Sequence, residues 1–314
     1  MSEQEQYLLS IILVSYNHEK YVLQALDSVF SQDIKCKVEV IVADDCSQDN
    51  TLDIIKSFEN SDSRFDFIFL ESESNLGITR NYERAFAACN GKYIAVLECD
   101  DYWANSTKLS QQIDFLEEHT AANLCATNYY VFEEQKAQFS KRVDWDCPYT
   151  FIGSRELILD NVIGNFSTCM YRNSAIKRLP KKLFSLKSYD WIINISLGID
   201  GLLGFISKPM SVYRLHSDGV WSGTGEIKRN IELLGLIKDY NEITNNVFEE
   251  DFANLSRLLQ SRNHQLNLLG HRSIGSTVKR AIAFLHTWSP RFVVILIHLL
   301  LPNAVLSRLG RLKK

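Results

Sequence analysis

The sequence lacks the glycine-rich loops by which two large classes of protein bind phosphates. A Gly-x-Gly-x-x-Gly pattern after the first apolar segment would predict a dinucleotide-binding fold, and Gly-x-x-x-x-Gly-Lys-Ser/Thr would predict a P-loop, but neither pattern occurs in the 314 residues. The first apolar segment is followed instead by Ser15-Tyr16-Asn17-His18. A phosphate bound there must be held by other groups, and a metal ion on carboxylates is the simplest substitute.

Paired cysteines and an N-terminal export signal are also absent. The seven cysteines include no Cys-x-x-Cys pair and lie mostly within apolar segments, so we expect reduced core side chains, a cytoplasmic protein and no zinc site. The first six residues, Met-Ser-Glu-Gln-Glu-Gln, are polar and acidic, without the basic and apolar regions of a signal peptide. We therefore expect no secretion by a cleaved signal.

Acidic residues are missing from the C-terminal part of the chain. No Asp or Glu follows Asp251, and this last segment contributes +10, so residues 1–251 must carry −14 to give the net charge of −4. A basic tail predicts an anionic partner, either a membrane surface or a nucleic acid. The apolar content of Ala281–Leu301 favours lipid, and we expect no nucleic-acid partner.

No apolar run is long enough to cross a bilayer. Pro290-Arg291 interrupts the apolar tail, and the remaining run Phe292–Leu301 has ten residues, whereas a spanning helix needs roughly 20. With Trp288 and basic flanks, the tail predicts a helix in the membrane interface, peripheral on the inner face of the cytoplasmic membrane. The alternative is a helical pair that packs on the rest of the chain or on another subunit of a homo-oligomer.

Four apolar segments alternate with segments of helical periodicity in the N-terminal part of the chain. The expected buried strands are Leu8–Val14, Val38–Ala43, Phe65–Leu70 and Lys92–Cys99. This alternation predicts right-handed crossovers. We therefore expect an α/β fold with a mixed, mainly parallel sheet and helices on both faces.

The later part of the chain is less regular. Further strands are expected at Leu124–Phe132, Phe166–Tyr171 and Leu202–Tyr213. A polar loop is expected over Glu133–Thr150, and an apolar helix over Ile192–Ile199. From Ile227 onward the chain is expected to be helical. The expected domains are residues 1–225, with halves 1–110 and 111–225, and a basic helical C-terminal extension of residues 226–314.

Polar residues follow three of the first four predicted strands at the point where each strand ends. They are Tyr16-Asn17, Asp44-Asp45 and the stretch Glu98–Asp101. The carboxyl ends of parallel strands meet at one edge of the sheet, where such folds bind ligands. Glu98 and Asp100 are two residues apart and project to the same side of an extended chain, which suits oxygen ligation of Mg²⁺ or Mn²⁺. An acidic turn is the plainer alternative, but three polar strand ends together favour a binding site.

Four ordered motifs carry a family resemblance. They are Ser10-Ile-Ile-Leu-Val-Ser-Tyr-Asn, Val40-Ile-Val-Ala-Asp-Asp-Cys-Ser-Gln-Asp-Asn-Thr, Asn75-Leu-Gly-Ile-Thr-Arg-Asn and Tyr93-Ile-Ala-Val-Leu-Glu-Cys-Asp-Asp-Tyr-Trp. Together they resemble glycosyltransferase family 2, the inverting enzymes of GT-A fold. The resemblance is dense over roughly the first 110 residues and continues more thinly to Ser222, through Tyr-Asp-Trp and Tyr-Arg-x-His-x-x-Gly-x-Trp-Ser.

The resemblance implies a nucleotide-sugar donor site in the first half of the domain. Its donor-binding residues would be Tyr16, Asn17, Asp44, Asp45, Arg80, Glu98, Cys99 and Asp100. Tyr16 would border the nucleobase, and Asp45, with Asp44 beside it, would hydrogen-bond the base and the ribose. Arg80 would face the donor near its diphosphate, although a solvated helix charge is its plainer role.

The resemblance also implies a metal site and a catalytic carboxylate. Glu98 and Asp100 occupy the family's Asp-x-Asp positions, with Glu in place of the first Asp. Asp100 is the expected metal ligand and Asp101 a less favoured one. His216 resembles a histidine that approaches the metal or the diphosphate, although a surface-loop histidine is its plainer role. Asp190 matches the catalytic carboxylate on the acceptor side, although it also stands where a helix N-cap would.

The implied activity is the inverting transfer of a hexosyl or N-acetylhexosaminyl group with Mn²⁺ or Mg²⁺. The donor would be a nucleotide-diphospho-sugar, UDP-linked, and the acceptor a saccharide or lipid-linked glycan in bacterial surface polysaccharide synthesis. The alternative is a non-catalytic nucleotide-sugar-binding partner subunit, against which the set Asp45, Asp100 and Asp190 argues. A nucleotidyltransferase that makes sugar nucleotides is disfavoured because its glycine-rich phosphate loop is missing.

Overall fold

The computed structural model describes residues 7–187, 190–217, 219 and 224–270. The chain divides into two compact units, residues 1–257 and residues 258–314, and only residues 258–270 of the second are described. The expected domain boundary between residues 225 and 226 stays a prediction. The stretch Ala281–Leu301, with its predicted interfacial helix, lies outside the described residues. Among the helices that are described, none has the length and apolar character to cross a membrane.

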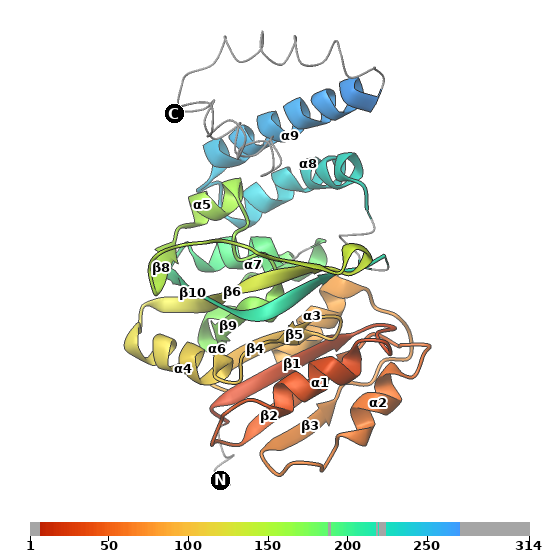
Figure 1. Cartoon of the computed structure of the whole chain (residues 1–314). Coiled ribbons are helices and arrows are strands. Elements are labelled where there is room, and N and C mark those ends of the chain that lie inside the picture. Colours follow the sequence, from red (N-terminus) through yellow and green to blue (C-terminus); the bar gives the residue numbers. More distant parts are fainter. Residues whose placement is uncertain (1–6, 188–189, 218, 220–223, 271–314) are drawn as a thin grey trace, which may run out of the picture. The chain divides into compact units, whose positions relative to one another are not determined.

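Four parallel strands form one half of the sheet, in the order β3-β2-β1-β4 (Figure 1). They are β1 (Leu9–Ser15), β2 (Val38–Asp44), β3 (Phe65–Phe69) and β4 (Tyr93–Glu98). The connecting helices are α1 (Val22–Phe30), α2 (Thr51–Ser57) and α3 (Ile78–Ala88). The four predicted strands and their parallel direction are confirmed.

Both faces of β1, β2 and β4 are buried, which explains their largely apolar sequences, whereas β3 at the edge of the sheet is partly exposed. On one face Leu9, Ile11 and Leu13 of β1 join the apolar stripe of α1 in a single core cluster. On the other face α3 lies against β1 and β2, with Tyr82 and Phe86 buried. Burial of one large apolar side chain contributes about 1.5–3 kcal/mol. The core therefore fixes the carboxyl ends of β1, β2 and β4 relative to one another.

The other half of the sheet is mixed. β9 (Cys169–Arg172) runs antiparallel to both β4 and β6 (Ala122–Glu133), whereas β10 (Leu202–Leu215) runs parallel to β6. The short strands are β5 (Tyr102–Trp103), β7 (Gln138–Lys141) and β8 (Tyr149–Ile152). The expectation of a loop over Glu133–Thr150 is wrong, because β7 pairs with β6 and β8 pairs with β10. These edge strands are mostly exposed, so they carry no apolar alternation that would have predicted them.

The remaining elements of the described chain are helices and 3-10 turns. The shorter ones are α4 (Lys108–Glu118), α5 (Ser154–Leu159), α6 (Asn173–Ile176), α7 (Asp190–Leu197) and the 3-10 turns η1 (Glu134–Lys136), η2 (Phe166–Thr168) and η3 (Lys181–Ser185). The predicted C-terminal helices are confirmed over the described residues as α8 (Glu226–Ile243) and α9 (Glu249–Gly270).

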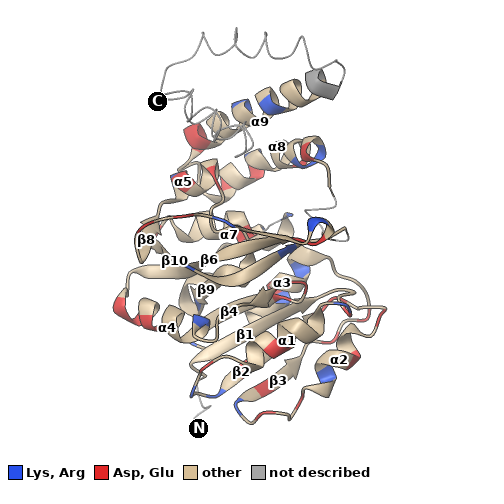
Figure 2. Cartoon of the chain, viewed as in Figure 1, with Lys and Arg blue, Asp and Glu red and all other residues tan. Residues whose placement is uncertain are grey.

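Helix α8 and the first turns of α9 are attached to the sheet domain through α7. The Trp191 ring centroid lies 6.0 Å from that of Tyr240 in α8 and 6.5 Å from that of Phe252 in α9. The acidic residues of α9 lie in its first turn, and Arg257 follows them (Figure 2). Negative charge is favourable there because the amino end of a helix carries partial positive charge.

Candidate active site

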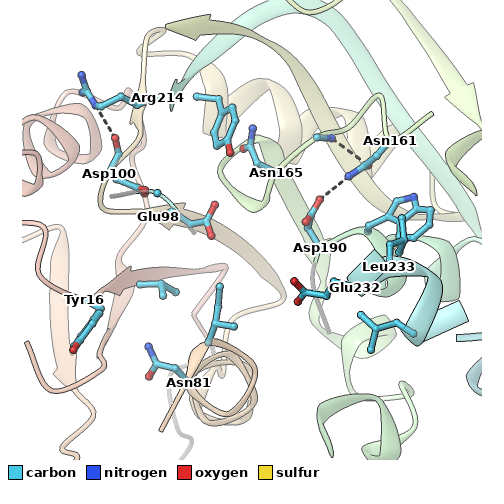
Figure 3. Close-up of a pocket in the computed structure, with 18 of the residues that line it drawn as sticks. Tyr16, Asn81, Glu98, Asp100, Asn161, Asn165, Asp190, Arg214, Glu232 and Leu233 are labelled. Carbon is cyan, nitrogen blue, oxygen red and sulfur yellow. Dashed lines mark hydrogen bonds between the residues drawn. The ribbon is translucent and has the colours of Figure 1, made fainter. Parts of the chain in front are cut away.

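A cavity of about 600 Å³ lies at the carboxyl ends of β1, β2 and β4 (Figure 3). The first half of the domain lines it with Tyr16, Asp45, Glu98 and Asp100, and the second half lines it with Asp190. Helix α8 contributes four further lining residues, Glu232, Leu233, Leu236 and Tyr240. The edge of the sheet where the sequence predicts a binding site is therefore where the cavity lies.

Asp100 lies among cationic and potentially cationic side chains. Its Oδ2 atom is 3.2 Å from Nε2 of His216 and 3.9 Å from Nε2 of His18. Nε of Arg214 donates to the Asp100 carbonyl oxygen at 2.8 Å. Burial by itself raises the pKa of Asp100, but the His216 hydrogen bond and the charges of His18 and His216 outweigh it, and the pKa lies below its ordinary value. Asp100 is therefore ionised at neutral pH.

Glu98 is two residues away and has the opposite tendency. Burial and the neighbouring Asp100 and Asp190 carboxylates raise its pKa well above the ordinary value. The Tyr82 hydroxyl donates to Glu98 Oε1 at 2.8 Å and offsets only part of this rise. Figure 3 shows Glu98 between Asp100 and Asp190. Glu98 therefore holds a proton more readily than either neighbour.

Asp101 has a structural part in this arrangement. Its side chain is 1% exposed and accepts hydrogen bonds from the Arg214 backbone N–H at 2.9 Å and from the Ser167 hydroxyl at 2.7 Å. Burial raises the pKa of Asp101 well above its ordinary value. The carboxyl thereby joins β10 and η2 to the end of β4, and Asp101 does not line the cavity.

The two aspartates after β2 organise the loops at the carboxyl ends of β1 and β2. Asp44 accepts from the Ser15 hydroxyl at 2.7 Å and from the Ser47 backbone N–H at 2.8 Å. Asp45 accepts from the backbone N–H groups of Leu76 at 2.7 Å and Gly77 at 3.0 Å, and it lines the cavity. The carboxylates therefore fix the turn after β2 and the residues just before α3.

The remaining residues predicted to bind the donor differ in whether they line the cavity. Tyr16 is 44% exposed and lines the cavity. Asn17 has a left-handed backbone with φ of 56°, and its Oδ1 accepts from the Gln48 backbone N–H at 2.7 Å. Cys99 is buried in the core, because its side chain points to the face opposite to Glu98. Neither Cys99 nor Arg80 is among the lining residues; Arg80 donates to Glu83 at 2.6 Å on the exposed side of α3.

Asp190 is the first residue of α7 and belongs to the same cavity. Its Oδ2 accepts a hydrogen bond from Nδ2 of Asn161 at 3.1 Å, and Oδ1 of Asn161 accepts from the Gly164 backbone N–H at 3.2 Å. Burial raises the pKa of Asp190 to about 6, although the Asn161 hydrogen bond lowers it in part. Such a carboxylate is ionised at pH 7.5 yet has a higher proton affinity than an ordinary aspartate.

The residues around Asp100 fit a hard divalent cation completed by a ligand. Among the described residues, no three His, Cys, Asp or Glu side chains form a ready metal cluster. Mg²⁺ is commonly held by one or two carboxylates together with phosphates of the substrate and waters. The carboxylate of Asp100 with the nearby imidazole of His216 provides such a partial set.

The sheet has the arrangement of a GT-A fold, with a parallel half, a mixed half and an acidic motif at the end of β4, where the two halves join. The model of the family described as "Glycosyl transferase family 2" matches residues 10–179. These are more than half of the 314 residues. The chain belongs to glycosyltransferase family 2.

Two relatives are similar to this chain in sequence. An uncharacterized protein of Mycobacterium tuberculosis (strain ATCC 25618 / H37Rv) is 30% identical over 222 residues, which are 68% of this chain and 60% of that protein. The UDP-Glc:alpha-D-GlcNAc-diphosphoundecaprenol beta-1,3-glucosyltransferase WfaP of Escherichia coli is 36% identical over 124 residues, 40% of this chain and 47% of that protein. The chain thus spans less than two thirds of the length of either relative.

A solved structure shares the fold. The mannosyltransferase PcManGT from Pyrobaculum calidifontis, in complex with GDP-Man and Mn2+, has a TM-score of 0.57 at 13% sequence identity. The similarity covers 91% of this chain and 82% of that chain. At this identity it establishes the fold alone, and the expected GT-A architecture is confirmed.

Proposed function

We propose that the protein is an inverting glycosyltransferase that moves a sugar from a UDP-linked donor to a glycan or lipid-linked acceptor in bacterial surface polysaccharide synthesis. Family membership and the cavity at the strand ends support the activity. The similarity to WfaP, whose name states a UDP-Glc donor and a diphosphoundecaprenol-linked acceptor, supports the substrate classes. The transferred group would be a hexosyl or an N-acetylhexosaminyl group.

The observation that carries the proposal is a pair of aspartates in one cavity whose pKa values are shifted in opposite directions. The pKa of Asp100 lies below its ordinary value and that of Asp190 is raised to about 6. Inverting transfer requires a base on one side of the anomeric carbon and compensation of negative charge on the other. Asp190 accepts the proton of the acceptor hydroxyl as this hydroxyl attacks. The acidic motif faces the departing nucleoside diphosphate.

Asp100 and His216 would hold Mn²⁺ or Mg²⁺ in this reaction. The bound cation supplies charge neutralisation for the leaving diphosphate. The Mn2+ in the PcManGT complex supports a divalent cation for this fold. Asp45 and Tyr16 line the same cavity on the donor side, where the resemblance to the family expects the nucleoside.

A screen of nucleotide sugars tests the proposal. The purified full chain is incubated with UDP-, GDP- and dTDP-sugars, with Mn²⁺ or with a chelator, and release of the nucleotide is measured. We expect hydrolysis of a UDP-sugar that depends on the cation, and faster release when an acceptor is added. Binding of UDP-sugars without any turnover would favour the non-catalytic partner subunit. Absence of nucleotide binding would contradict the proposed function.

A further inference from the structure

Asn165 is a polar residue of the cavity whose side chain makes no hydrogen bond to the described part of the protein. Asn165 is 5% exposed and lines the cavity, and Figure 3 shows it on the same side as Asn161 and Arg214. Among the described residues, neither its amide nitrogen nor its amide oxygen has a hydrogen-bond partner. An unpaired buried amide costs about 1–3 kcal/mol per group. Such an orphaned amide that lines a cavity is expected to have a ligand as its partner.

The backbone around Asn165 is held firmly while its side chain is left unpaired. The Asn165 carbonyl oxygen accepts from the Thr168 hydroxyl at 2.8 Å, and its N–H donates to the Ile163 carbonyl oxygen at 3.0 Å. The preceding Gly164 has a left-handed φ of 83°, and a Cβ atom there would lie 1.9 Å from the Tyr129 hydroxyl. Only glycine fits this turn, so the turn presents Asn165 in one orientation.

The loop that carries Asn165 runs between Asp190 and the acidic motif at the end of β4. At one end Asn161 donates to Asp190. At the other end the Ser167 hydroxyl donates to Asp101 at 2.7 Å and accepts from the Glu98 backbone N–H at 3.1 Å. Asn165 lies between these two anchor points along the chain. In the proposed reaction the transferred sugar occupies the space between Asp190 and the acidic motif.

We infer that the Asn165 carboxamide binds a hydroxyl group of the transferred sugar and helps to select that sugar. The inference rests on the proposed function, because that function places the transferred sugar between Asp190 and the acidic motif, beside Asn165. A carboxamide both donates and accepts, so it pairs with a sugar hydroxyl in both directions. A site built to hydrogen-bond a substrate hydroxyl discriminates strongly against analogues that lack it.

The test compares binding of UDP, UDP-glucose and UDP-N-acetylglucosamine to wild type, Asn165→Ala and Asn165→Asp, with Mn²⁺, by isothermal titration. UDP has no sugar, so its affinity should stay within about twofold of wild type. The affinity for the better-bound nucleotide sugar should fall about tenfold in Asn165→Ala, as expected for one or two lost hydrogen bonds. Asn165→Asp keeps the shape and the acceptor oxygen and should lose less. Equal affinity for the sugar nucleotides in all three proteins would overturn the inference.

Deoxy analogues of that nucleotide sugar provide a second, independent readout. In wild type, removal of one particular hydroxyl should weaken binding about tenfold, and Asn165→Ala should show little further loss with the same analogue. If the losses of affinity caused by Asn165→Ala and by removal of a hydroxyl were additive for every hydroxyl, the inference would be overturned while the proposed function stayed intact. Failure of wild type to bind any nucleotide would overturn both.

Asn128 is the matched control for folding. It is also a buried asparagine, but its Nδ2 donates to the Val143 and Ser207 carbonyl oxygens at 2.9 and 3.0 Å. Asn128→Ala should therefore lower Tm clearly more than Asn165→Ala, whose amide makes no protein hydrogen bond in the described chain. A larger loss of Tm in Asn165→Ala would mean that the amide serves the fold, and it would overturn the inference.

Discussion

Asp100 and Asp190 are the same residue type in one cavity, yet their surroundings differ. Asp100 lies beside the imidazoles of His216 and His18, whereas Asp190 accepts a side-chain hydrogen bond from Asn161. Burial raises the pKa of both, but at Asp100 the His216 hydrogen bond and the two nearby histidines outweigh this rise. The comparison shows that neighbours, and not burial, decide which carboxylate stays ionised to face a cation and which one accepts a proton.

Asp190→Asn should have the largest effect. An amide has the same size but accepts no proton, so the rate of transfer should fall by about 10²–10⁴-fold, while affinity for UDP with Mn²⁺ stays within about twofold of wild type. A transfer assay beside isothermal titration measures both. Asp144→Asn is the control, since Asp144 is an exposed carboxylate paired with Lys141 away from the cavity. Normal turnover by Asp190→Asn would show that Asp190 is not the base.

Asp100→Asn should have the next largest effect, with Glu98→Gln as its matched partner. Loss of the ionised Asp100 should lower turnover about 100-fold and weaken Mn²⁺-dependent UDP binding. Glu98 has a raised pKa, so a neutral amide resembles its protonated form, and Glu98→Gln should retain turnover within about threefold. Manganese titrations of both variants check the contrast. Equal losses in the two variants would mean that both carboxylates hold the cation.

The first half of the fold and the acidic motif could be predicted because β1, β2 and β4 are buried on both faces. A strand with unbroken apolar sequence, such as β1 or β4, ends where the first polar residues begin, and parallel strands end at one edge. Tyr16, Asp45 and Asp100 were expected there and do line the cavity. The family motif also led to Cys99, whose side chain is in the core because successive residues of a strand point to opposite faces.

Other parts of the site could not be predicted because they depend on contacts distant in the sequence. Asn161 and Asn165 lie in an irregular segment between α5 and η2, which has no apolar periodicity. Their place in the cavity depends on the bond from Ser167 to Asp101 and on the space beside Tyr129 that only Gly164 allows. The closely spaced Asn and Gly residues were a signal for a tight turn but not for its position.

The pH dependence of kcat/KM should show the raised pKa of Asp190. The base must be ionised, so kcat/KM should fall tenfold per pH unit below about pH 6, the pKa of Asp190 in the folded protein. The profile is best measured between pH 4.5 and 8 in Glu98→Gln, which removes the titration of the neighbouring carboxyl. An ordinary aspartate would keep activity down to about pH 4. An acidic limb near pH 4 would remove the proposed distinction between the two aspartates.

Asn161→Ala should have the smallest effect. It tests whether the Asn161 hydrogen bond keeps the pKa of Asp190 from rising further. The Asn161 amide donates to the Asp190 carboxylate and so favours its ionised form. Without this bond the pKa of Asp190 should rise further, moving the acidic limb of kcat/KM upward by up to about one pH unit. Above pH 8 the carboxylate is ionised in either protein, so the loss there should be within about threefold. Asn90→Ala is the control. Asn90 lies just before β4, at the end of the strands opposite to the cavity, and its amide donates a hydrogen bond to Glu39. A uniform loss at every pH, with no shift of the limb, would mean that Asn161 positions Asp190 without tuning its proton affinity.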